Sequence, residues 1–126
     1  MKNVMIPEGY NRVMPYLIVA DADGFLAFAK MVFGAEEKYK ELRDEKTIRH
    51  AEVRIGDSVI MFAQSTEEYS PQTAGMFIYV DNADKVFKKA LAAGAQEVMA
   101  PSSQSYGRSS GVRDPFGNTW WITSVQ

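Results

Sequence analysis

The segment RHAEVRIGD, from Arg49 to Asp57, carries the side chains best suited to acid–base chemistry. Its apolar and polar residues alternate, so a strand here turns His50 and Glu52 toward the same face. Two residues along a strand span about 6–7 Å. At that separation a carboxylate can orient an imidazole that acts as a general base on one bound substrate. The alternative is that this face is solvated or lies at a subunit contact, where Glu52 and Arg54 have no chemical role.

A second candidate is Arg108, the first of the two arginines in the segment SYGRSSGVRD. The residues Ala100–Gly111 are rich in turn formers and predict one long loop, which places Arg108 just before a strand. A guanidinium there can bind a carboxylate or phosphate through two parallel hydrogen bonds. A structural salt bridge is the other interpretation, and the pattern favours neither. Asp114 and Asn118, in DPFGN, are expected to be turn residues.

The two tryptophans of the chain are adjacent, at Trp120 and Trp121. Neighbouring residues of a strand point to opposite faces of the sheet. We therefore expect Trp120 to pack in the core under a helix and Trp121 to face a cavity. The alternative for Trp121 is that it fills space without contacting any ligand.

These side chains are positioned by a unit that occurs twice. VADADGFLAFAKMVFGAEE begins at Val19 and VDNADKVFKKALAAGAQE begins at Val80, and both run from V-x-x-A-D through an amphipathic stretch to Gly-Ala. Further on, IGDSVIMF and FGNTWWIT repeat at the same spacing. A long period that occurs only twice indicates a duplicated supersecondary unit rather than a solenoid.

Each unit predicts the order βαβββ, and the chain is expected to be one α+β domain over 1–126 with modules at about 12–64 and 75–125. Strands are expected at 13–20, 38–42, 48–55 and 58–63 in the first module, and at 75–80, 97–100, 111–113 and 119–125 in the second. Asp21 and Asn82 occupy helix N-cap positions. Gly34 and Gly94 are expected to end the two helices.

The ordered set PYLIVAD, VFGAE, RHAEVRIGDSVIMF and YGRSSGVRDPFGNTWWIT resembles a known superfamily. This is the vicinal-oxygen-chelate superfamily of glyoxalase I, bleomycin-resistance proteins and extradiol dioxygenases, and the chain is most similar to its PhnB-like branch. The resemblance extends from Val13 to Thr123. It implies two βαβββ modules that form curved mixed sheets around a cavity, usually within a homodimer.

Metal-dependent members of this superfamily hold a divalent cation with His or Glu from the opening and closing strands of both modules. The resemblance places these ligand positions at Met14, Met61 (Ile60 if the register slips by one), Gly75 and Trp121. None of these residues offers an imidazole or a carboxylate. We therefore expect no catalytic metal and no cofactor.

Aromatic residues share the strand parity of the ligand positions. Tyr16, Phe77 and Tyr79, together with Met61 and Trp121, are expected to line an aromatic, apolar cavity that suits a planar or apolar small molecule. No residue is assigned a catalytic role, and His50 and Glu52 are the candidates. The expected ligand-binding residues are Tyr16, His50, Glu52, Met61, Phe77, Tyr79, Arg108 and Trp121.

Composition excludes several classes of protein. The 126 residues are 46% hydrophobic and 24% charged, with a net charge of −2 and no basic run, so nucleic acid is not expected to be the main partner. The lack of cysteine excludes disulfides and a thiol nucleophile. No apolar run approaches the roughly 18 residues of a membrane helix. The N-terminal residues lack the apolar stretch of a signal peptide, so we expect a cytoplasmic protein without a membrane partner.

These features favour a metal-free, homodimeric protein that binds a small molecule. One alternative is a glyoxalase-like lyase or isomerase, or another enzyme, that works through His50 and Glu52 or through a metal at an unrecognised place. A second alternative is a structural dimer module with no small ligand. Fold resemblance does not choose among them.

Overall fold

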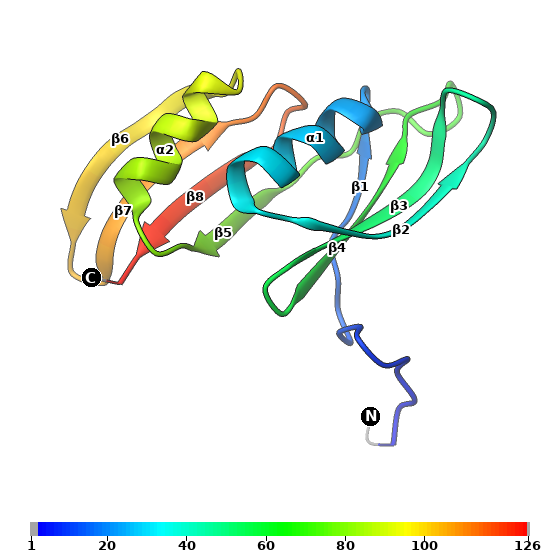
Figure 1. Cartoon of the computed structure of the whole chain (residues 1–126), viewed down its shortest axis with the longest axis horizontal. Helices are drawn as coiled ribbons and strands as arrows, with labels where there is room; N and C mark the ends of the chain where they lie inside the picture. The colour runs from blue at the N-terminus through cyan, green and yellow to red at the C-terminus, as the bar shows by residue number, and fades with distance from the viewer. Residues whose placement is uncertain (1–2, 126) are drawn as a thin grey trace.

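Two modules of one helix and four strands make up the protein, whose computed structural model describes residues 3–125 (Figure 1). The first module consists of β1 (Tyr16–Val19), α1 (Ala22–Phe33), β2 (Glu36–Leu42), β3 (Ile48–Ile55) and β4 (Ser58–Gln64). The second consists of β5 (Gly75–Tyr79), α2 (Ala83–Ala92), β6 (Gln96–Gln104), β7 (Gly107–Arg113) and β8 (Thr119–Ser124). The predicted α+β class and the repeated βαβββ order are confirmed. Residues 1, 2 and 126 of the expected domain lie outside the described residues.

Each module forms its own mixed sheet. The strand orders are β1-β4-β3-β2 and β5-β8-β7-β6. β1 pairs in parallel with β4, β5 pairs in parallel with β8, and the remaining pairs are antiparallel. Tyr16 lies opposite Met61, and Phe77 lies opposite Trp121. Met61, not Ile60, is therefore the first-module counterpart of Trp121.

Local signals set the ends of the helices. The side chains of Asp21 and Asn82 each accept a hydrogen bond from a backbone amide of the first helical turn, as predicted. Gly34 ends α1 with a φ of 67°, in the left-handed region that favours glycine. In α2, Ala93 is the C-cap, and Gly94 follows with a φ of 105°. No helix within residues 3–125 is long and apolar enough to cross a membrane.

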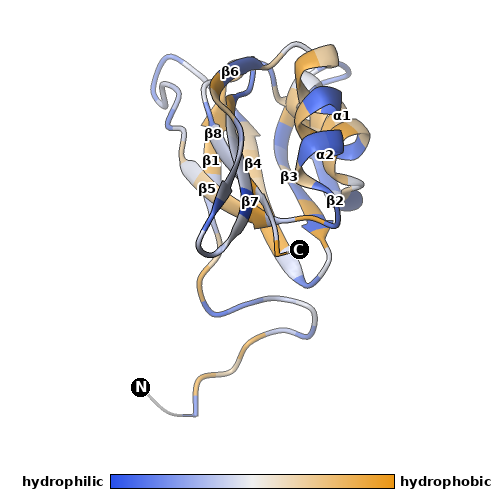
Figure 2. Ribbon diagram, turned by 90° about the vertical axis from the view of Figure 1, so that its left-hand side faces the viewer, coloured by the Kyte–Doolittle hydropathy of each residue, from blue (hydrophilic) through white to orange (hydrophobic). Residues whose placement is uncertain are grey.

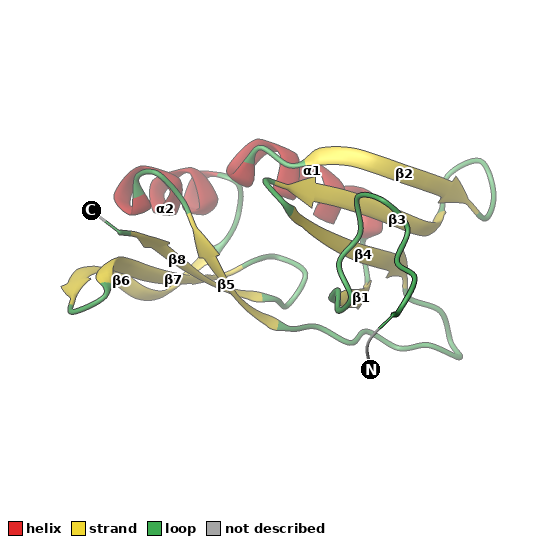
Figure 3. Ribbon diagram, turned by 90° about the horizontal axis from the view of Figure 1, so that it is seen from below, coloured by secondary structure: helices red, strands yellow, loops and turns green. Residues whose placement is uncertain are grey.

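Both helices lie on the same side of the two sheets and touch each other (Figure 2). The core fills the space between them and the sheets, with Phe25 and Phe28 of α1 packed among Phe62, Trp120 and Ile122 of the strands. Trp120 is 1% exposed and lies on the helix side, as predicted. Figure 3 shows both helices on one side of the two sheets and no helix of the described chain on the other side, which we call the helix-free face.

A buried carboxylate organises the turn between β7 and β8. Asp114 is 3% exposed. It accepts hydrogen bonds from the backbone amides of Phe116 and Asn118 at 2.9 Å, from the Asn118 side-chain amide at 3.0 Å and from the Trp120 indole at 2.9 Å. Asn118 in turn accepts a hydrogen bond from the Ala74 amide at 3.0 Å. The two residues are turn residues, as predicted, and they also hold the core tryptophan.

The segment Ala100–Gly111, predicted as one long loop, forms a hairpin instead. β6 continues to Gln104, β7 begins at Gly107, and these two residues pair across a two-residue turn. The prediction was wrong because it rested on the local turn preference of Ser and Gly, whereas pairing with neighbouring strands determines strand formation here. Gly107 has a φ of 138°, and a Cβ there would lie 2.5 Å from the Ser124 carbonyl oxygen.

Candidate functional site

Four hydrogen-bonded side chains lie on the helix-free face of the first sheet. The Tyr10 hydroxyl donates to Glu52 Oε1 at 2.6 Å, and Glu52 Oε2 lies 2.8 Å from His50 Nε2. His50 Nδ1 lies 3.3 Å from the Tyr16 hydroxyl, and the two rings stack with centroids 5.5 Å apart. We call these four residues the Tyr10–Tyr16 network. The predicted pairing of His50 with Glu52 is present as a direct hydrogen bond.

Three segments of chain position this network. Strand alternation in β3 turns Ala51, Val53 and Ile55 toward the core and sends His50 and Glu52 to the opposite face, as predicted. Tyr16 comes from β1, and Met61 of β4 lies between the two strands as the register partner of both Tyr16 and Glu52. Tyr10 belongs to the segment that precedes β1. Nothing in the local sequence pointed to it, because its partner is 42 residues away.

The electrostatics of the network define which nitrogen of His50 carries a proton. Glu52 is 5% exposed, and this burial acts to raise its pKa. The hydrogen bonds from Tyr10 and His50 outweigh burial, so the pKa of Glu52 is lowered overall and the group is a carboxylate at neutral pH. A carboxylate only accepts hydrogen bonds, so neutral His50 carries its hydrogen on Nε2 and presents a lone pair on Nδ1. The hydrogen bond to Glu52 also raises the pKa of Tyr10.

Two hollows flank the network. One, of about 560 Å³, is lined by Tyr16, and the other, of about 440 Å³, is lined by Tyr10 and Glu52. The remaining lining residues of the larger hollow are Ile18, Arg43, Arg49, Ala63, Gln64, Thr66, Glu67, Glu68 and Tyr69. The network thus runs from one hollow to the other, with His50 in the middle.

The second sheet carries an aromatic group of its own. Phe77 and Tyr79 of β5 have ring centroids 5.2 Å apart, and Tyr106 lies 6.3 Å from Phe77. Trp121 of β8 is half-buried on the same face, next to Phe77 in register. Within one chain the predicted cavity residues therefore form two groups, one on each sheet, rather than a single wall.

Gly111 of β7 lies directly beside the Trp121 indole. A Cβ at position 111 would lie 2.6 Å from the ring. We expect Gly111→Ala to displace the indole and to cost about 1–3 kcal/mol of unfolding free energy, as overpacking does. Gly75→Ala is the control, because its Cβ would meet nothing within 4 Å. Thermal unfolding measures the stability of both variants. If Gly111→Ala were as stable as Gly75→Ala, the Trp121 indole would not rest on Gly111.

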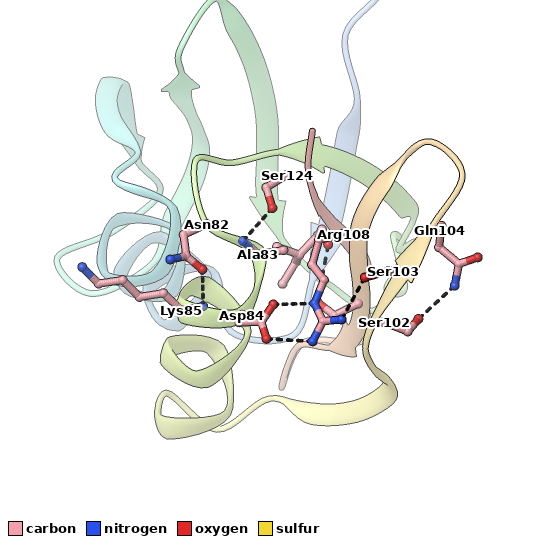
Figure 4. A network of polar contacts seen from close by, with 11 residues as sticks. Asn82, Ala83, Asp84, Lys85, Ser102, Ser103, Gln104, Arg108 and Ser124 are labelled. Carbon is pink, nitrogen blue, oxygen red and sulfur yellow. Dashed lines mark hydrogen bonds and ion pairs between the residues drawn. The ribbon is translucent and has the colours of Figure 1, made fainter. Parts of the chain in front are cut away.

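Arg108 lies on the helix side of the second sheet, where it faces Asp84 of α2 (Figure 4). Its guanidinium donates two hydrogen bonds to Asp84 in the first turn of α2, at 2.9 and 3.0 Å, and one to Ser103 at 3.2 Å. The hydrogen bonds from Arg108 to Asp84 lower the pKa of that carboxyl group. Of the two interpretations of Arg108, the structure contains the salt bridge, on the helix side of the sheet and away from Trp121.

The residues at the expected ligand positions do not fit a divalent cation. Met14 and Met61 belong to the first module and Gly75 and Trp121 to the second, and none offers a hard donor. Glu52, the register partner of Met61, already has both carboxylate oxygens in hydrogen bonds. Over residues 3–125, no three His, Cys, Asp or Glu side chains are grouped so that they could hold a metal ion.

Comparison with known proteins agrees with this architecture. The family model described as Glyoxalase/Bleomycin resistance protein/Dioxygenase superfamily matches residues 9–122. The chain belongs to this superfamily. The glyoxalase/bleomycin resistance/dioxygenase match spans both modules, from the segment that contains Tyr10 to the last strand.

This superfamily member is similar to other proteins both in sequence and in structure. An uncharacterized protein of Mycobacterium tuberculosis (strain H37Rv) is 30% identical over 118 residues, covering 84% of this chain and 69% of that protein. TioX from Micromonospora sp. ML1 has a TM-score of 0.76 at 24% identity, covering 92% of this chain and 99% of that one. The PhnB protein from Bacillus cereus has a TM-score of 0.69 at 18% identity, covering 90% and 99%. These two solved structures show the shared fold.

Proposed function

We propose that this superfamily member binds a small aromatic or apolar molecule on the helix-free faces of its sheets, without a catalytic metal. The observation that carries the proposal is the exposure of aromatic side chains there: Tyr16 is 51%, Phe77 50% and Tyr79 64% exposed. Large apolar surfaces that a single chain leaves uncovered mark interaction sites. Aromatic walls with a few polar groups are typical of small-molecule pockets.

A homodimer is part of the proposal. The two aromatic groups lie on separate sheets, so a cavity that uses both needs the first sheet of one protomer to meet the second sheet of the other. Closed two-fold symmetry produces two such cavities at once. The protein should then have a mass of about 28 kDa in solution, twice the 14.1 kDa of the chain. Light scattering that finds a monomer at all concentrations would rule out this assembly.

The binding proposal is tested with the fluorescent probe 8-anilinonaphthalene-1-sulfonate. We expect Phe77→Ala to weaken its binding roughly tenfold, which corresponds to about 1.4 kcal/mol. Met31→Ala is the matched control, because Met31 is 63% exposed but lies on α1. Equal weakening by the two variants would refute the aromatic face as a binding site. Elemental analysis that finds one transition metal per chain would refute the proposal that the protein works without a metal. A dimer that does not bind the probe would favour the alternative of a structural module without a small ligand.

A further inference from the structure

We propose that the first sheet also carries a metal-independent general acid–base site, in which Tyr16 exchanges a proton with a bound substrate. His50 takes up the proton that Tyr16 releases, while Glu52 and Tyr10 are positioning residues that hold the imidazole. This goes beyond binding, because it assigns the Tyr10–Tyr16 network a chemical step.

The order of the hydrogen bonds supports this assignment. Glu52 uses one oxygen for the Tyr10 hydroxyl at 2.6 Å and the other for His50 Nε2 at 2.8 Å, which fixes both the carboxylate and the ring. The Nδ1 lone pair of His50 then faces the Tyr16 hydroxyl at 3.3 Å. The same order of groups occurs in hydrolytic triads, where a nucleophile or acid contacts a base and a third group orients that base. The longest of these contacts joins His50 to Tyr16, at the end where a substrate would bind. Catalytic hydrogen bonds are often long before the substrate is bound.

Burial decreases along the network from Glu52 through His50 to Tyr16. The Glu52 side chain is 7% exposed and that of His50 21%, whereas Tyr16 is 51% exposed. The orienting carboxylate is thus shielded from water, and the phenol that would meet a substrate lies at the wall of the 560 Å³ hollow. A purely structural polar cluster would not need its last member to face open space.

The surroundings of Tyr16 indicate the class of substrate. Charged groups of both signs line the hollow, namely Arg43, Arg49, Glu67 and Glu68. Glu41 of β2 lies opposite His50 in the sheet register. The hollow also has apolar lining: Ile18, two residues from Tyr16 in β1, its register partner Ala63, and the Tyr69 ring. We therefore expect a small planar carbon acid, stacked beside the Tyr16 ring, whose acidic C–H bond is next to an electron-withdrawing group.

The proton balance of the step is complete without a metal or an oxidant. The Tyr16 oxygen accepts the proton of the substrate carbon as its own proton passes to His50 Nδ1, and the C–H electron pair forms a new π bond in the substrate. The imidazolium that results lies against the Glu52 carboxylate, which stabilises it. With 5-nitrobenzisoxazole as a probe, the C–H bond breaks, a nitrile forms, the N–O bond breaks and a phenolate leaves. Water then removes the proton from His50.

The test measures ring opening of 5-nitrobenzisoxazole by the full-length protein and its variants at neutral pH. General acid–base catalysis contributes on the order of 10²-fold, so we expect Tyr16→Phe and His50→Gln each to lower kcat/KM by about that factor. Glu52→Gln should lower it about tenfold or more. The matched controls are Tyr39→Phe, whose ring lies 6.1 Å from His50, and Glu41→Gln, and both should stay within about twofold of the unaltered protein. The proposal would be overturned if the unaltered protein were no more active than His50→Gln. It would also be overturned if Tyr16→Phe kept full activity.

A second measurement does not depend on the probe. His50 is the only histidine, so ¹⁵N NMR of the imidazole reports its tautomer without overlap. In the unaltered protein at neutral pH we expect the neutral ring to carry its hydrogen on Nε2. In Glu52→Gln the new amide can donate to Nε2, which moves the hydrogen to Nδ1 and removes the base that faces Tyr16. A hydrogen on Nδ1 in the unaltered protein, or an unchanged tautomer in a folded Glu52→Gln variant, would contradict the assigned role of Glu52.

Discussion

Replacing Trp120 with glutamate is expected to unfold the protein, whereas the same replacement at Trp121 leaves it folded. Trp120 is 1% exposed, and its ring centroid lies 4.4 Å from that of Phe33. Truncating a buried tryptophan alone costs about 3–5 kcal/mol. The new carboxylate would also be buried beside Asp114, which now accepts the Trp120 indole hydrogen. The sum approaches the roughly 5–15 kcal/mol that stabilises a typical domain.

Trp121→Glu is the matched comparison, because the side chain is the same and the positions are adjacent. Trp121 is half-buried on the helix-free face, so a carboxylate there reaches water. Thermal unfolding of both variants, followed by circular dichroism, measures the difference. A loss of stability at Trp121 that equals or exceeds the loss at Trp120 would show that the faces of β8 are assigned incorrectly.

Replacing Asp114 with alanine is expected to cost at least about 3 kcal/mol of unfolding free energy. The carboxylate accepts four hydrogen bonds in a site that is 3% exposed. A buried donor left without a partner costs about 1–3 kcal/mol. Asn118 and Trp120 are both buried, so neither the Asn118 amide nor the Trp120 indole can find water in place of the carboxylate.

Asp57→Ala is the control for this change. Asp57 lies in the β3–β4 hairpin of the first module and is exposed, so its loss should change stability by no more than about 0.5 kcal/mol. Urea unfolding of both variants tests the difference. If Asp114→Ala were as stable as Asp57→Ala, the buried carboxylate would not be what holds the turn and the indole together.

Several features that follow from short stretches of sequence were predicted correctly. The N-cap roles of Asp21 and Asn82 depend on a side chain and an amide within one helical turn. The opposite faces of Trp120 and Trp121, and the shared face of His50 and Glu52, follow from the two-residue period of a strand. The duplicated βαβββ order was visible because each copy repeats these short-range signals at a constant spacing.

Other features depend on contacts between distant residues, and no local pattern contains them. The Ala100–Gly111 segment has the composition of a loop, but pairing across the β6–β7 turn makes it a hairpin. That hairpin brings Arg108 to Asp84, so the salt bridge that composition offered as one of two interpretations is present. Tyr10 meets Glu52 because the segment before β1 passes the face of the first sheet. The hydrogen bonds of the Tyr10–Tyr16 network join three separate segments, so their geometry exists only after the first sheet has formed and placed β1 two strands from β3.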